Sequence, residues 1–170
     1  MWNNLRSKMP KSWNTTRIEN RYGGGIPDVH VCAEGLPFWI ELKVTKTNRV
    51  NVSAHQVAWN FAYSQSGGVS FFLVAALASS NLYLFDGVHG RGLAEHGLKT
   101  GRVGSVGSVG SGSGQVGSGQ VGSGSGQVGS GQVGSGTMVP CLWSGSDQVG
   151  LREAMLDIVR GRIAPGLEEK

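Results

Sequence analysis

A low-complexity segment restricts the fold of this 170-residue chain more than any other feature of its sequence. Between residues 101 and 136 the chain contains Gly, Ser, Val and Gln with a single charged residue, Arg102. Three copies of VGS (103–111) are followed by two tandem copies of the unit SGSGQVGSGQVG (111–122 and 123–134). This composition offers few large apolar side chains to bury, so we predict a disordered linker. A glycine-rich repeat sheet is the alternative.

The predicted linker divides the chain into three parts. We expect a globular core at 1–99, the linker at 100–137, and a C-terminal strand and helix segment at 138–170. A Gly-rich coil of roughly 36 residues has a root-mean-square span of about 30–36 Å, which is short enough for the last segment to dock on the core. The chain length allows one such core, and one functional site is therefore expected.

Sequence patterns in the core predict a small α/β domain. Helices are expected where a capping residue precedes periodic apolar positions, and strands where apolar residues alternate or run together between turns. The first expected helix is 12–22, and Gly23 to Gly25 would end it. The second is 54–66, which opens with the capping box Ser53-Ala54-His55-Gln56. A C-terminal helix, capped by Ser146 or Asp147, is expected to carry the apolar residues Val149, Met155, Leu156 and Val159. The expected strands are 29–32, 38–45, 69–76 and 82–85.

A hairpin register follows if Glu34-Gly35 forms the centre of the turn between the first two of these strands. That register opposes Asp28 to Glu41, and opposed residues of an antiparallel pair share one face of the sheet. Lys43 emerges on the same face because it follows Glu41 by two residues. The other face carries the apolar residues expected in the core: Val29, Val31, Phe38 and Ile40.

The opposed carboxylates of Asp28 and Glu41 predict a metal site. Like charges across a ladder repel each other, and a divalent cation between them removes the repulsion. Hard oxygen ligands select Mg²⁺ or Mn²⁺, and the Lys43 ammonium is placed to offset charge on a phosphate bound there. The alternative is that Asp28 is a turn residue after a proline and that Glu41 and Lys43 are solvated charges at a sheet edge.

The motif Pro27-Asp28 followed by Glu41-Leu42-Lys43 resembles that of the PD-(D/E)xK nuclease superfamily. The segments RIENRYGGGIPDVHV and FWIELK, with Q-x-x-W beginning at Gln56, are most similar to the phage-encoded branch near the VRR-NUC and Holliday junction resolvase-like nucleases. The resemblance covers about residues 12–85. It implies a small restriction-endonuclease-like core, in which a helix, a mixed central sheet and flanking helices precede the linker and the C-terminal helix.

The same resemblance implies roles for individual residues. Asp28 and Glu41 would ligate the metal together with the backbone carbonyl of Leu42, and Lys43 would be the catalytic lysine. Glu19 matches an additional acidic residue that many members carry on the first helix, as catalytic group and metal ligand; otherwise it is a solvated helix charge.

Gln56 matches a family glutamine on the helix after the E-x-K strand, although its place in the capping box explains it almost as well. His30 would oppose Trp39 on the site face, where a contact with a base or water competes with a structural role. The basic residues that flank the site, and that we expect to contact DNA phosphates, are Lys46, Arg49, Arg17 and Arg21.

These observations predict a Mg²⁺-dependent DNA endonuclease that hydrolyses phosphodiester bonds, and Mn²⁺ is expected to substitute. The resemblance implies branched DNA in phage replication, recombination or repair as the substrate. The sequence contains no helix-turn-helix or zinc-finger motif, which favours recognition of DNA structure over base sequence. A catalytically silent DNA-binding or assembly module is the alternative. A small-molecule phosphohydrolase is a third possibility. The absence of a nucleotide-binding motif such as a P-loop argues against it.

Charge and cysteine usage agree with a DNA partner in a reducing compartment. The formal net charge of +4 suits a polyanion without proving one. Cys32 and Cys141 are far apart and lack metal-ligand spacing, so we expect reduced thiols in the cytoplasm, which is the host cytoplasm if a phage encodes the chain. No apolar run is long enough to span a membrane, so no membrane partner is expected. The sequence leaves the oligomeric state open, and the resemblance suggests a homodimer.

Overall fold

A six-stranded mixed sheet forms the centre of the computed structural model, which describes residues 1–19, 24–99 and 141–163. The strands lie in chain order across the sheet, and β3 and β4 run parallel while the other neighbours are antiparallel. The strands are β1 (Asn14–Arg17), β2 (Val29–Ala33), β3 (Leu36–Thr45), β4 (Ser70–Ala76), β5 (Asn81–Asp86) and β6 (Cys141–Gly145). The helices are α1 (Trp2–Lys8), α2 (Ala54–Gln65), the 3₁₀ turn η1 (Gly87–His89), α3 (Gly90–His96) and α4 (Gln148–Ile163).

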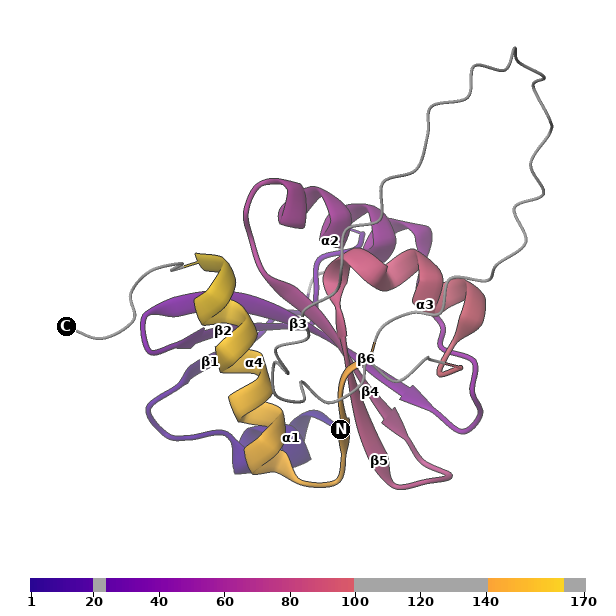
Figure 1. Cartoon of the computed structure of the whole chain (residues 1–170), viewed down its shortest axis with the longest axis horizontal. Coiled ribbons are helices and arrows are strands. Elements are labelled where there is room, and N and C mark those ends of the chain that lie inside the picture. The colour runs from indigo at the N-terminus through magenta and orange to yellow at the C-terminus, as the bar shows by residue number, and fades with distance from the viewer. Residues whose placement is uncertain (20–23, 100–140, 164–170) are drawn as a thin grey trace, which may run out of the picture. The chain divides into compact units, whose positions relative to one another are not determined.

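Helices cover both faces of the sheet (Figure 1). On one face, α1 and α4 bury Leu5, Leu151 and Met155 against apolar residues of β2 to β5. On the other face, α2 and α3 pack Val57 and Leu93 against a smaller apolar cluster from β4 and β5. The mixed central sheet with flanking helices confirms the predicted α/β class. None of the helices in the described ranges has the length and apolar character needed to cross a membrane.

The β2–β3 hairpin has the predicted register. Val29 pairs with Ile40, and Val31 pairs with Phe38. Glu34 and Gly35 form the two-residue turn with φ angles of 53° and 79°, as the primed hairpin turns require at their central positions. The ladder begins with the Val29–Ile40 pair, so Asp28 lies immediately before the first residue of β2 and the predicted pair of Asp28 with Glu41 is not part of the ladder.

Two further predicted elements are confirmed with their boundary signals. Ser53 caps α2, and the reciprocal hydrogen bonds of the capping box with Gln56 are both present. After α2, Gly67 adopts a φ of +84° and the chain turns into β4. At the start of α4, the carboxylate of Asp147 accepts hydrogen bonds from the first backbone N–H groups of the helix. Val149, counted among the apolar positions of this helix, is half exposed, whereas Leu151 is buried.

The predicted helix at 12–22 is wrong. Residues 14–17 form strand β1, which pairs antiparallel with β2, while the first helix is α1, nearer the N-terminus. The physical reason is tertiary: β1 satisfies the backbone groups on the outer edge of β2, and Trp13 enters the core beside Phe38. Thr15 and Thr16 are β-branched, which suits an extended edge strand. Residues 20–23 lie outside the described part of the chain.

Helix α3 was not predicted, whereas β6 and α4 lie in the predicted C-terminal strand and helix segment. Helix α3 begins at Gly90, a residue that disfavours helices, and this glycine is needed because a Cβ there would lie 2.9 Å from the Phe72 ring. Strand β6 pairs with β5, and α4 packs on β3 and β6, so these two elements belong to the same sheet domain. The linker predicted at 100–137 lies outside the described residues.

Candidate metal and catalytic site on strand β3

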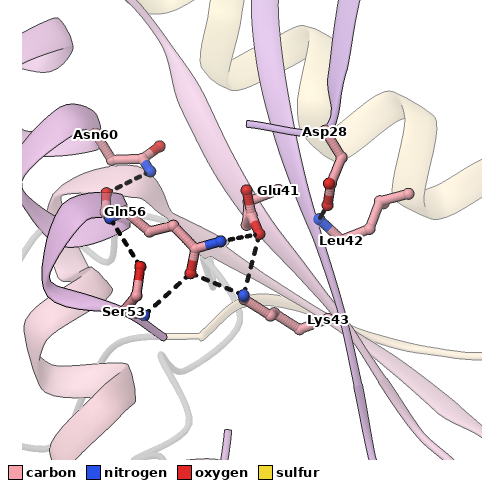
Figure 2. Close-up of polar contacts among 7 residues, drawn as sticks. All are labelled: Asp28, Glu41, Leu42, Lys43, Ser53, Gln56 and Asn60. Carbon is pink, nitrogen blue, oxygen red and sulfur yellow. Dashed lines mark hydrogen bonds and ion pairs between the residues drawn. The ribbon is translucent and has the colours of Figure 1, made fainter. Parts of the chain in front are cut away.

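A buried carboxylate is at the centre of the candidate site. Glu41 is 2% exposed, and its Oε1 accepts hydrogen bonds from Gln56 Nε2 at 2.6 Å and from Lys43 Nζ at 3.0 Å. Gln56 Oε1 in turn accepts from Lys43 Nζ at 2.8 Å and from the Ser53 backbone N–H at 3.0 Å (Figure 2). Gln56 therefore closes the capping box and also connects the start of α2 to the charged pair on β3.

The second oxygen of Glu41 is left without a partner. Among the described residues, nothing donates a hydrogen bond to Oε2. Burial, and after it the charge of Asp28, raise the pKa of Glu41 from 4.5 to about 7, although Lys43 acts in the opposite direction. A buried, unpaired carboxylate oxygen is costly unless something positive binds it. Oε2 is therefore available to bind a cation, in a site where burial already destabilises the charged form of Glu41.

Asp28, the residue immediately before β2, also contacts β3. Its Oδ2 accepts a hydrogen bond from the Leu42 backbone N–H at 2.8 Å (Figure 2). In a strand, the N–H and C=O of one residue point to the same side, so the Leu42 carbonyl also faces the β2 side. Continuing the observed register would place Pro27 opposite Leu42, and a proline has no N–H to donate. In this register Pro27 therefore donates no hydrogen bond to the Leu42 carbonyl.

The structure supplies oxygen donors that fit a hard divalent cation. These donors are the unpaired Glu41 Oε2, the Asp28 carboxylate and the Leu42 carbonyl, and oxygen ligands of this kind select Mg²⁺ or Mn²⁺. No group of three or more His, Cys, Asp or Glu side chains is gathered for a metal within residues 1–19, 24–99 and 141–163. A cation here would therefore bind two carboxylates and backbone oxygen, and water would complete its shell.

A pocket of about 410 Å³ opens beside Asp28. Arg17 of β1 and Leu42 of β3 line it together with residues at the start of α1. Glu41 and Lys43 are not in its lining, since both lie on the α2 side of β3. A second pocket of about 460 Å³ lies between α1 and the ends of β3 to β5, and it holds none of the predicted site residues.

The structure does not bring all the predicted residues together. Glu19 follows β1 instead of lying on a helix, its side chain is 73% exposed, and it forms an ion pair with Arg17 at 3.8 Å. Lys46 and Arg49 are exposed on the segment that joins β3 to α2. Arg21 lies outside the described residues.

Asn60 is a site-associated residue that sequence reasoning missed. It is fully buried, and its side-chain amide donates to the Gln56 carbonyl at 2.8 Å (Figure 2). A polar residue four positions after Gln56 lies on the same face of the helix, and that spacing was the available signal. Its burial depends on the packing of α2 against the sheet.

Comparisons with known proteins are sparse. No protein-family model matches the sequence, and no curated protein matches it. Among solved structures, the chain is similar to Hjc, a Holliday junction resolvase from the archaeal hyperthermophile Archaeoglobus fulgidus, with 16% identity and a TM-score of 0.37. The match covers 45% of this chain and 64% of the archaeal chain, which is less than two thirds of that protein's length.

Proposed function

We propose that this chain is a divalent-metal-dependent DNA endonuclease that hydrolyses phosphodiester bonds, with branched DNA as its substrate. One observation carries the proposal: a buried glutamate, with one oxygen unpaired and its pKa raised to about 7, lies beside a second carboxylate and a half-buried lysine ammonium. A structural charge would gain nothing from this arrangement, because an unpaired buried carboxylate oxygen destabilises the fold. Strongly perturbed carboxyl groups of this kind concentrate at functional sites.

Glu41, Asp28 and the Leu42 carbonyl would hold Mg²⁺ or Mn²⁺. When bound, such an ion supplies a Lewis acid for a phosphate and lowers the pKa of water. In hydrolysis, the water oxygen bonds to phosphorus as the bond to the 3′ oxygen breaks, so that the products carry a 5′ phosphate and a 3′ hydroxyl. Lys43 Nζ has a defined position for this reaction, because Glu41 and Gln56 both accept hydrogen bonds from it. Its ammonium can offset charge that develops on the phosphate oxygens.

Gln56 is a positioning residue in this proposal. Its amide group accepts from Lys43 and donates to Glu41, so it fixes the relative orientation of the two side chains. The Ser53 N–H holds the same amide oxygen and thereby ties the site to the start of α2. Loss of Gln56 should therefore weaken both the fold and the geometry of the site.

We propose that the exposed basic side chains around the site contact phosphates of the DNA backbone. Lys46 and Arg49 follow β3 directly, and Arg17 lines the pocket that opens beside Asp28. Arg21 is proposed to join them, with Glu19 as an additional metal ligand or catalytic acid. Contacts of this kind fix position without reading sequence.

The finer identity is also part of the proposal. We infer a phage-encoded nuclease of the VRR-NUC or Holliday junction resolvase-like type, working in the host cytoplasm. A four-way junction presents two equivalent strands, so a homodimer would place one site on each. The segment 100–137 would act as a linker. The segment 138–170, which follows the linker, would complete the sheet domain.

The test is cleavage of four-way junction, flap and linear DNA, each with Mg²⁺ and with a chelator. Lys43→Ala should lower the cleavage rate about 10²- to 10³-fold, which is the size expected when one group that stabilises transition-state charge is removed. Lys11→Ala, which removes an exposed lysine, is the matched control and should cleave like the wild type. Cleavage that survives the chelator, or that Lys43→Ala leaves undiminished, would overturn the mechanism. DNA binding without cleavage under any metal would favour a silent binding module.

A further inference from the structure

A row of four aromatic rings extends from β2 across β3 to α2. His30 packs against Trp39 with ring centroids 4.9 Å apart, and Trp39 packs against Trp59 at 5.6 Å. Trp59 stacks on Tyr63 at 4.8 Å with an interplanar angle of 21°. We call these four residues the aromatic row. Each pair is at the separation at which aromatic rings attract one another, so the rings form one continuous surface.

The aromatic row is not part of either core. The aromatic residues that fill the interior, Phe38, Phe71, Phe72 and Phe85, are fully buried. All four members of the row are instead partly exposed, and neither apolar cluster of the described residues includes them. A set of large rings that pack on each other yet stay outside the core calls for an explanation beyond core packing.

The row begins beside the candidate site. Trp39 and Glu41 are two residues apart on β3, so their side chains leave the same face of the sheet at about 7 Å separation along the strand. On α2, Trp59 follows Gln56 by three residues and Tyr63 follows Trp59 by four, so these side chains share one side of the helix. The contacts of Gln56 with Glu41 and of Trp59 with Trp39 show that this side faces β3.

We propose that the aromatic row binds unpaired bases of the DNA substrate next to the phosphate that is cleaved. The proposal rests on the proposed nuclease function and specifies its substrate: DNA with single-stranded nucleotides adjoining the cleavage point. The spacing along β3 supports this, because about 7 Å is close to the distance between successive phosphates of a single strand. A nucleotide whose phosphate lies at Glu41 and Lys43 would have its neighbour's base over Trp39.

The chemistry of the row favours unpaired bases over duplex DNA. Stacking needs an exposed base face, which a duplex hides, and it tolerates any base because every base has one. The row is flanked by the Lys43 ammonium, which suits a polyanion, and its four members carry no carboxylate that would repel one. An apolar protein partner would not need this proximity to a buried metal-type site.

The experiment measures DNA binding without metal, so that it does not depend on cleavage. The probes are a labelled 15-mer oligothymidine and a blunt hairpin duplex, followed by fluorescence anisotropy. Trp59→Leu and Trp39→Leu should weaken oligothymidine binding about 5- to 100-fold, the range expected from losing one base-stacking ring, and should leave duplex binding unchanged. Trp59→Phe keeps a ring face and should retain most of the affinity. Phe61→Leu is the matched control, because Phe61 is 53% exposed on α2 outside the row.

The outcomes separate the two proposals. The proposal that the aromatic row stacks on bases is overturned if the leucine variants bind oligothymidine as tightly as the wild type, or if they lose affinity for the duplex equally. It is also overturned if the wild type binds neither probe. Thermal unfolding of each variant checks the fold, and the other leucine variant carries the test if one of the two unfolds. Normal cleavage by all aromatic variants would support the proposed nuclease function and refute a role of the aromatic row in substrate binding. If the protein binds oligothymidine through the aromatic row but never cleaves DNA, the proposed nuclease function is refuted and the proposed role of the row in binding stands.

Discussion

Replacing Glu41 by glutamine should stabilise this protein at alkaline pH while abolishing its activity. The free energy that burial and the nearby Asp28 charge cost the Glu41 anion, less what Lys43 offsets, appears as its raised pKa, from 4.5 to about 7. At 1.36 kcal/mol per pH unit, this shift corresponds to about 3 kcal/mol. Glutamine has nearly the same shape and carries no charge, so the variant avoids that cost.

The pH window follows from the sign of the shift. A carboxyl group whose pKa is higher in the folded than in the unfolded chain binds its proton more tightly in the folded state. Its contribution to stability is fully present below about pH 4.5 and is lost as the pH rises through about 7. The free energy of unfolding of the wild type should therefore fall by about 3 kcal/mol relative to Glu41→Gln between pH 4.5 and pH 8.

Urea unfolding in a chelating buffer, at intervals from pH 4.5 to pH 8.5, measures this difference. Comparing wild type with Glu41→Gln cancels the other titrating groups, and Glu153→Gln, an exposed glutamate on α4, is the matched control that should follow the wild type. Addition of Mg²⁺ should restore part of the wild-type stability at pH 8 and none in Glu41→Gln, because a ligand stabilises only the state that binds it. Parallel pH profiles for wild type and Glu41→Gln would refute the assignment of the raised pKa to this buried carboxyl.

Five further substitutions, in three experiments, test the local architecture by urea or thermal unfolding. Gln56→Ala should lower the free energy of unfolding by about 1–2 kcal/mol, because it removes a capping-box partner and a donor to a buried carboxylate; an unchanged midpoint would contradict the network. Gly25→Ala should cost more than Gly35→Ala. Both residues have positive φ, which costs alanine about 1–2 kcal/mol, but at Gly25 a Cβ would also lie 2.2 Å from a backbone oxygen of α2, whereas the space at Gly35 is open. Met155→Ala should cost about 2–5 kcal/mol if α4 completes the core, whereas the half-exposed Val149→Ala should stay within about 0.5 kcal/mol, and equal effects would contradict the docking of α4.

The hairpin and the start of α2 were predictable because their determinants are local. Glu34 and Gly35 accept positive φ, and the alternation on both sides of them allows one register in which the apolar residues share a face. The capping box joins Ser53 and Gln56, which are three residues apart. Signals of this kind act within one turn and do not depend on the rest of the chain. They also placed Glu41 and Lys43 on the same face.

Other features depend on segments that are distant in sequence. Residues 14–17 lie within the segment 12–22, whose sequence predicts a helix, yet they form β1 because β2 offers an unpaired edge. The sequence placed Glu41 on a polar face, but its burial beneath α2, its unpaired oxygen and its raised pKa arise only when that helix packs on the sheet. The aromatic row likewise needs β2, β3 and α2 together. A periodic pattern determines which way a side chain points, whereas the packing of remote elements determines whether water reaches it, and this exclusion of water converts an ordinary glutamate into a candidate metal ligand.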